Sequence, residues 1–135
     1  MADTFELEIA TPDRLVLKEQ VSEAQIPGKD GFLGVLPGHA PLLSELACGM
    51  LSYVAEGRTH YMAIHRGFVE VMPAKTRVLA ETAERADEID VARAQAALER
   101  AQKRLGDLTP GIDMSRALNS LERAQARIET VRHKQ

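Results

Sequence analysis

The stretch at residues 26–43 reads Ile-Pro-Gly-Lys-Asp-Gly-Phe-Leu-Gly-Val-Leu-Pro-Gly-His-Ala-Pro-Leu-Leu. Four glycines and three prolines interrupt two short apolar runs, at residues 32–36 and 42–43. Glycine reaches backbone angles that are closed to other residues, whereas proline fixes its own φ and removes a donor. The stretch therefore predicts a strand bent between tight turns, followed by a rigid loop at residues 37–41. It has the features of a shaped surface and not those of a reactive centre.

Short strand patterns surround this stretch. Residues 4–10 alternate strictly, with Phe5, Leu7 and Ile9 on one face, as expected for a half-buried strand. Turn signals separate further apolar runs at residues 15–17, 21–26, 50–55, 59–64, 68–71 and 76–81. Several short strands without a helical period predict a sandwich or barrel, and short connections favour antiparallel hairpins. We expect an antiparallel β-sandwich over residues 1–86.

The period of the apolar residues changes at residue 87. From there they follow a 3-4 spacing, which is typical of helices that pack on one another. The positions with this spacing are Val91, Ala94, Leu98, Ala101, Leu105, Met114, Ala117, Leu121, Ala124, Ile128 and Val131. The pattern predicts an antiparallel two-helix hairpin over residues 87–135, with helices at about 90–105 and 113–131. Residues 106–111 form the predicted loop, with Gly106 as the C-terminal cap.

The two predicted helices share sequence. Residues 89–105 align with residues 112–128 at an offset of 23, and ten of the seventeen positions are identical. Each segment opens with Ile-Asp, so that the aspartate is expected to cap the helix and the isoleucine to staple onto its first turn. The arginines of the repeat are Arg93, Arg100, Arg104, Arg116, Arg123 and Arg127.

Composition excludes several classes of protein. A formal net charge of −3 gives no general reason to expect a nucleic-acid partner. No apolar run approaches the roughly 20 residues that cross a bilayer, and the N-terminus lacks a secretory pattern. Cys48 is the single cysteine, which fits a reducing compartment. We therefore expect membrane contact only indirectly, through a protein partner.

No catalytic or metal site is predicted. Lys29 lies in Gly-Lys-Asp-Gly, but no Ser or Thr follows it, as a phosphate loop requires. His39 has no second ligand at a suitable spacing, and His60 and His65 are expected to face opposite sides of a strand. Catalysis is not indicated.

The string Ile-Asp-x-x-Arg-Ala at residues 89–94 has two interpretations. It is either a helix cap followed by a surface arginine, or part of an anion site in which arginines of both helices meet phosphates. Spacing alone favours the cap. Without further information the chain fits an adaptor, with a stand-alone nucleotide sensor as a second class and a small hydrolase as a weaker third.

Four motifs carry a resemblance that spans nearly the whole chain. Residues 31–43, 67–71, 78–86 and 89–94 resemble the ε subunit of bacterial F-type ATP synthase. The resemblance implies a non-catalytic central-stalk subunit of the proton-translocating enzyme, with the γ subunit, the c-ring and the α/β catalytic head as partners. It implies a peripheral location at the cytoplasmic face of the bacterial plasma membrane. It also implies a hairpin that either folds against the sandwich or extends into the head, where it inhibits ATP hydrolysis.

The resemblance assigns roles to individual residues, with no catalytic residue and no metal. Contacts with γ and the c-ring are expected at Phe32, Leu36, Pro37, Gly38, His39, Ala40 and Pro41. No cofactor is required, and ATP as a regulatory ligand would meet Glu84, Ile89, Asp90, Arg93, Ala94, Arg100, Arg123 and Arg127. Contacts with the head are expected at Arg116, Arg123 and Arg127. Family members often have Gly-Gly where this chain has Arg66-Gly67, which argues against a positive backbone dihedral at residue 66.

Overall fold

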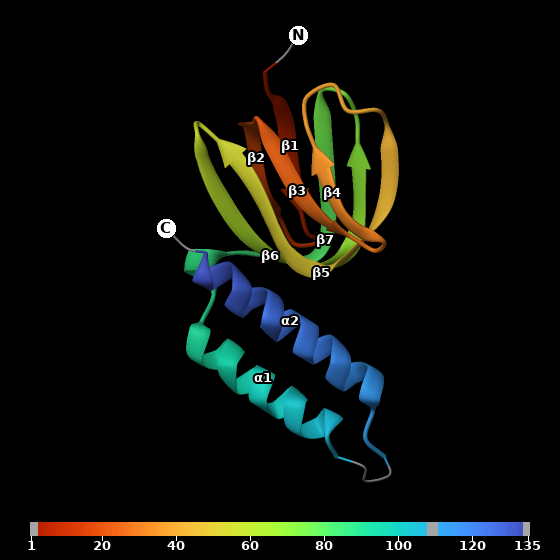
Figure 1. Cartoon of the computed structure of the whole chain (residues 1–135), viewed down its shortest axis with the longest axis vertical. Helices are drawn as coiled ribbons and strands as arrows, with labels where there is room; N and C mark the ends of the chain where they lie inside the picture. The colour runs from red at the N-terminus through yellow and green to blue at the C-terminus, as the bar shows by residue number, and fades with distance from the viewer. Residues whose placement is uncertain (1–2, 108–110, 134–135) are drawn as a thin grey trace.

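The computed structural model describes residues 3–107 and 111–133. A β-sandwich forms the N-terminal part, and a pair of helices lies below it (Figure 1). The elements in chain order are β1 (Phe5–Ala10), β2 (Leu15–Val21), β3 (Glu23–Gly28), β4 (Gly31–Val35), β5 (Leu42–Ala55), β6 (Arg58–Val71), β7 (Lys75–Arg85), the 3-10 turn η1 (Ala86–Glu88), α1 (Val91–Leu105) and α2 (Met114–Arg132).

Hydrogen bonds join the seven strands in the order β2-β1-β7-β6-β5-β3-β4. The long strands β5 and β6 curve, so that the sheet folds over on itself into two layers (Figure 1). The predicted β-sandwich is confirmed, but it is not wholly antiparallel, because β1 and β7 pair in parallel. This pair joins segments far apart in the chain, which short-connection reasoning cannot foresee.

Strand β6 corrects a second expectation. The sequence predicted one strand at residues 59–64 and another at residues 68–71, whereas β6 runs unbroken from Arg58 to Val71. Gly67 has a φ of 131°, and a Cβ there would lie 1.9 Å from the carbonyl oxygen of Leu79. Glycine thus lets the strand kink closely against β7 without ending. Arg66 also has a positive φ, of 52°, which is the opposite of what the arginine suggested.

The sandwich has its own hydrophobic core. The alternating residues Phe5, Leu7 and Ile9 are buried in it, together with residues of the other strands such as Leu51 and Val78. This cluster contains no residue of α1 or α2 among the residues that the structure describes. The sandwich therefore buries its apolar side chains independently of the helices.

The helices form an antiparallel pair in which α2 lies between the sandwich and α1 (Figure 1). The alanines of the predicted seam, Ala94 and Ala101 on α1 and Ala117 and Ala124 on α2, are buried, so the helices approach closely. Residues 108–110 of the predicted loop lie outside the described residues. Gly106 is the C-terminal cap of α1, but with a right-handed φ of −85°.

A second, smaller apolar cluster joins the hairpin to the sandwich. Ala63 of β6, Ala126 of α2, and Ile89 and Ala94 at the start of α1 form this cluster, with Cys48 packed against it. Both predicted caps are present, since Asp90 and Asp113 each accept a hydrogen bond of 3.0 Å from the third helical N–H. Ile89 and Ala94 belong to the same cluster, which agrees with the expected hydrophobic staple.

Candidate functional site

A cleft of about 330 Å³ lies between the two helices and the end of β7. Residues from β7, η1, α1 and α2 line it. They are Glu84, Glu88, Asp90, Arg93, Ala94, Ala97, Arg100, Ala101, Arg104, Ser120, Arg123 and Arg127. Five of these residues are arginines and three are carboxylates, so the cleft has an excess of positive charge.

Helical spacing explains why the arginines converge. Arg93, Arg100 and Arg104 are spaced by seven and four residues on α1, which places them on one face. Arg123 and Arg127 occupy one face of α2 in the same way. Because small alanines separate the helices at the seam, the two basic faces border one cleft. Such an arrangement of guanidinium groups suits an anion, since each group offers several donors in a fixed plane.

Two of the arginines are held by contacts with other side chains. Arg127 donates from Nε to Glu84 Oε1 of β7 at 2.6 Å, in a partly buried ion pair. Arg123 donates to Ser120 Oγ at 3.3 Å and lies 3.5 Å from Nε2 of His65. By contrast, no ion pair between residues that the structure describes involves Arg93 or Arg100. These two guanidinium groups are available to a ligand without breaking an ion pair.

The carboxylates at the rim have structural partners. Asp90 is the N-cap of α1. Glu88 accepts from the Arg85 N–H at 3.0 Å and forms an ion pair of 3.0 Å with Arg14. The backbone hydrogen bond, followed by the contacts with Arg14, lowers the pKa of Glu88. Glu88 is therefore held as a carboxylate directed to these partners and offsets little of the charge on α1.

The structure brings together most of the residues that the resemblance assigned to ATP. Glu84, Asp90, Arg93, Ala94, Arg100, Arg123 and Arg127 all line the cleft. Ile89 does not line the cleft and packs instead in the cluster between α2 and the sheet. The sequence interpretation missed Glu88, Ala97, Ala101, Arg104 and Ser120. Ala97 and Arg104 could have been found, because they lie on the same helical face as Arg93 and Arg100.

Arg116 lies apart from this cleft. It lines a separate hollow with Arg104 and Asp113 near the start of α2, and it is exposed. Arg123 and Arg127, also expected to contact a catalytic head, are partly buried against the sandwich. In this position of the hairpin, Arg116 alone of the three presents its side chain freely to a partner.

The loop predicted as a partner surface is held in a defined shape. The Gly38 N–H donates to Pro73 O at 2.8 Å, and the His39 N–H donates to Leu36 O at 3.2 Å. Gly38 has a φ of 82°, a conformation that favours glycine. Leu36 is 59% exposed, and Ala40 and Pro41 are exposed beside the half-buried Pro37.

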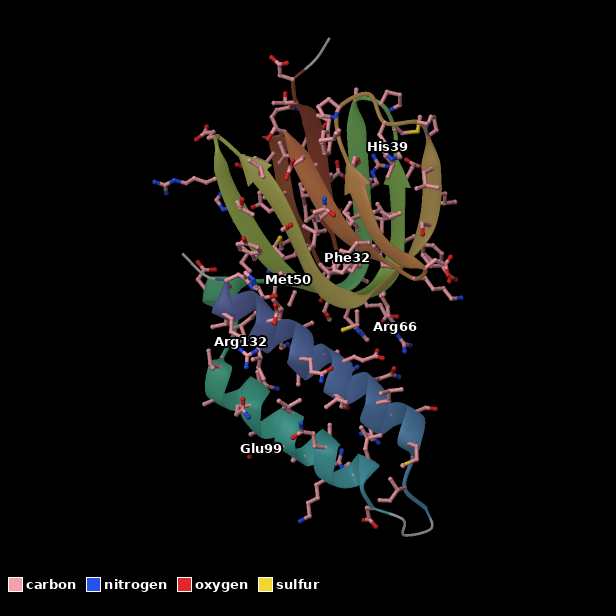
Figure 2. The ribbon with its side chains drawn as sticks, in the orientation of Figure 1. Phe32, His39, Met50, Arg66, Glu99 and Arg132 are labelled. Atoms are coloured by element: carbon pink, nitrogen blue, oxygen red, sulfur yellow. The ribbon has the colours of Figure 1, made fainter. Side chains whose placement is uncertain are left out.

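Phe32 is separated from the rest of that predicted surface. Its side chain is 64% exposed on β4, but it lies toward the hairpin end of the sandwich, whereas His39 lies at the opposite end (Figure 2). The predicted set therefore covers two places on the sandwich and not one patch.

An exposed apolar row crosses the sheet and was missed. Phe68 of β6 pairs with Leu79 of β7, Leu79 with Ala10 of β1, and Ala10 with Leu15 of β2. Phe68, Leu79 and Leu15 are each about half exposed. The signal was present in the sequence, because adjacent apolar residues in one strand, such as Phe68-Val69 and Val78-Leu79, must face opposite sides. We call Leu15, Leu79 and Phe68 the apolar row.

Within residues 3–107 and 111–133, no group of three or more His, Cys, Asp or Glu side chains is arranged to hold a metal ion. The described helices include none that is long and apolar enough to span a bilayer.

Comparison with known families matches both parts of the chain. The family described as ATP synthase, Delta/Epsilon chain, beta-sandwich domain matches residues 4–86. The family described as ATP synthase, Delta/Epsilon chain, long alpha-helix domain matches residues 87–132. Among curated relatives, the ATP synthase epsilon chain of Koribacter versatilis is 60% identical over 105 residues, which cover 78% of this chain and 74% of the relative. That of Solibacter usitatus is 55% identical over 103 residues, covering 76% and 77%.

Solved structures show the same fold. A chain in the structure of the Euglena gracilis mitochondrial ATP synthase, OSCP/F1/c-ring, aligns with a TM-score of 0.85 and 25% identity. The alignment covers 98% of this chain and 84% of that one. A chain of the Tetrahymena thermophila mitochondrial ATP synthase central stalk and c-ring aligns with a TM-score of 0.54 at 16% identity, which supports the fold alone.

Proposed function

The chain belongs to the Delta/Epsilon family of ATP synthase chains, non-catalytic subunits of the central stalk, and from this premise we propose that its hairpin regulates ATP hydrolysis and binds ATP as the regulatory ligand. The observation that carries the proposal is the arginine-lined cleft between α1 and α2. Its volume of about 330 Å³ is within the range of small-molecule sites.

The ligand contacts follow from the charges in the cleft. Arg93 and Arg100, which form no ion pair with another described residue, are the proposed primary phosphate ligands. Arg123 and Arg127 contribute from α2, so that a triphosphate would join both helices. Ala94, Ala97 and Ala101 give the cleft a small apolar wall against which a base can pack. We assign no metal or other cofactor to the site.

ATP would favour the compact hairpin. A ligand shifts a conformational equilibrium only by its differential affinity for the two states. The cleft includes Glu84 of the sandwich as well as residues of both helices, so it is complete only while α2 lies on the sheet. When ATP is scarce, the released hairpin would extend and present Arg116, Arg123 and Arg127 to acidic groups of the catalytic head, inhibiting hydrolysis.

The sandwich supplies the proposed contacts with the rest of the rotor. An isolated domain gains nothing from leaving the apolar row exposed to water. The row therefore suits contact with a protein partner. We assign this row to the γ subunit and the loop at residues 36–41 to the c-ring end of the stalk. In this arrangement the chain is peripheral, at the cytoplasmic face of the bacterial plasma membrane, and meets the membrane only through the complex.

Calorimetric titration of the full chain with ATP tests the ligand. Arg93→Ala should weaken ATP binding by about tenfold or more, because it removes a charge-assisted contact. Arg116→Ala is the matched control, since it occupies the equivalent position of the repeat but lies outside the cleft. No binding by the unaltered chain, or equal effects of the two substitutions, would reject this site.

A separate assay tests regulation. The full chain would be added to a catalytic ATPase head that lacks its own Delta/Epsilon chain, at low and high ATP. We expect inhibition that high ATP relieves, and weaker inhibition by Arg116→Ala. Binding without inhibition at any ATP concentration would leave a coupling subunit with no regulatory role.

A further inference from the structure

The hairpin is attached to the sandwich mainly through α2. α2 lies against β5 and β6, whereas α1 packs on α2 (Figure 1). Among the described residues, the apolar part of this interface is small. Its buried cluster consists of Ala63, Ile89, Ala94 and Ala126, with Cys48, Ile128 and Val131 packed against it. The sandwich core is a separate cluster. The polar contacts between β6 and α2 therefore have a large share in holding the hairpin in place.

One of these contacts comes from a residue in an uncommon conformation. Arg66 has a φ of 52°, which side-chain-bearing residues rarely adopt. This backbone turns its side chain off the sheet toward the N-terminal half of α2 (Figure 2). There the Arg66 guanidinium donates to the side-chain oxygen of Asn119. The conformation that the strand adopts at Arg66 thus serves a contact between the two parts of the molecule.

The preceding residue makes a second contact with α2. His65 is 6% exposed, and its Nδ1 has no hydrogen-bond partner among the described residues. Its Nε2 lies 3.5 Å from Arg123 Nη1 and 3.7 Å from Glu81 Oε2. A neutral imidazole with Nε2 unprotonated accepts from the Arg123 guanidinium. A protonated imidazole cannot, and it would place a second positive charge beside that guanidinium.

We propose that His65 and Arg66 form a latch that holds α2 on the sandwich in the absence of any nucleotide, and that protonation of His65 opens it. Asn119 and Arg123 are the residues of α2 that the latch engages. The inference does not depend on ATP binding, because every contact in it is between residues of the chain.

Charged and titratable groups from four elements face His65. They are Cys48 of β5, Arg66 of β6, Glu81 and Glu84 of β7, and Glu122, Arg123 and Arg127 of α2. Burial and then Arg123 lower the pKa of His65, and the carboxylates only partly oppose them. Release of α2 exposes His65 and removes Arg123, so the released form binds the proton more readily. Docking of α2 is therefore most stable above pH 6.5, the ordinary pKa of a histidine. Its stability decreases as the pH falls through that value toward the lowered pKa of His65.

Cys48 provides a probe for the docked hairpin. It packs against the cluster between α2 and the sheet, and burial raises the pKa of its thiol to about 11. The rate of alkylation of Cys48 in the native full chain, divided by the rate in the unfolded chain at the same pH, reports how far α2 protects it. The measurement is made without nucleotide.

A double-mutant cycle tests the Arg66 contact. Arg66→Gly and Asn119→Ala should each raise the relative alkylation rate three- to tenfold, and the double variant should show no further increase. Glycine suits the positive φ at residue 66, so Arg66→Gly should leave the thermal unfolding midpoint of the sandwich unchanged or higher. Unchanged rates in both single variants, or fully additive effects, would overturn this half of the latch.

The pH dependence tests His65. Between pH 7.5 and pH 5.5 the relative alkylation rate should rise, by at most tenfold for each pH unit because one proton is bound. His65→Gln keeps an acceptor for Arg123 but cannot be protonated, so it should remain protected with a flat profile. His60→Gln, on the same strand beside Tyr53, should retain the native profile. A pH dependence that survives in His65→Gln would overturn the proposal.

Discussion

The two helices are close copies that occupy different positions. Both open with an aspartate cap, and both bury alanines at the same steps of the seam. Yet α2 lies on the sandwich and α1 lies outside it (Figure 1). The residues that differ between the copies account for this. At the offset of 23, the buried Ala126 of α2 corresponds to the exposed Lys103 of α1.

The comparison separates two kinds of information in a repeat. Identical positions fix how each helix starts and how the pair packs. The positions that differ decide which copy can lie on a sheet, because a small apolar residue fits there and a lysine does not.

We expect the largest effect on docking of α2 from Ala126→Lys. A lysine at this site, which is 6% exposed, would bury an unpaired charge and cost the docked state about 3 kcal/mol or more. We expect loss of Cys48 protection while the sandwich remains folded. Lys103→Ala is the matched control and should change stability by no more than about 0.5 kcal/mol. Equal tolerance of both substitutions would mean that this interface is not occupied in solution.

Arg127→Ala and Arg104→Ala compare equivalent arginines. Arg127 forms the 2.6 Å ion pair with Glu84, and no ion pair within the described part of the chain involves Arg104. Loss of the partly buried pair should weaken docking by about 1 kcal/mol, against less than about 0.5 kcal/mol for Arg104→Ala. Amide hydrogen exchange along β6 would measure the difference. The reverse order of effects would show that α1 contributes the stronger attachment.

Asp90→Ala and Asp113→Ala should give the smallest difference. Both caps make the same hydrogen bond of 3.0 Å, so each substitution should cost about 1 kcal/mol in thermal unfolding. The two losses should agree to within about 0.5 kcal/mol when nucleotide is absent. A clear inequality there would mean that one aspartate has a structural role besides its cap.

The sequence predicted features that depend on local pattern. The helices, their caps and the alanine seam followed from spacing within short segments, whereas the grouping of Arg93 with Arg100 came from the family resemblance. The β-sandwich followed from alternation and turn signals. These features need only neighbouring residues for their explanation.

Features that depend on distant segments were not predicted. The turn pattern around Gly67 predicts the end of a strand, because the close approach of Gly67 to Leu79 is visible only once β7 lies beside β6. The positive φ of Arg66 likewise accompanies a hydrogen bond from its side chain to Asn119, which lies 53 residues further along the chain. The family resemblance assigns Ile89 to ATP because Ile89 belongs to the motif, whereas its side chain packs between α2 and the sheet.

The parallel pairing of β1 with β7 has a consequence for the order in which the protein is made. β1 leaves the ribosome before the other strands of the sandwich, but its partner on one side is β7, the last of them. Until residues 75–79 of β7 have been synthesised, one edge of β1 has no neighbour and the core around Ile9 stays open. Long-range pairing of this kind slows folding. The growing chain therefore carries an open strand edge while β2 to β6 are made, and α1 and α2 emerge only after the strand that closes this edge.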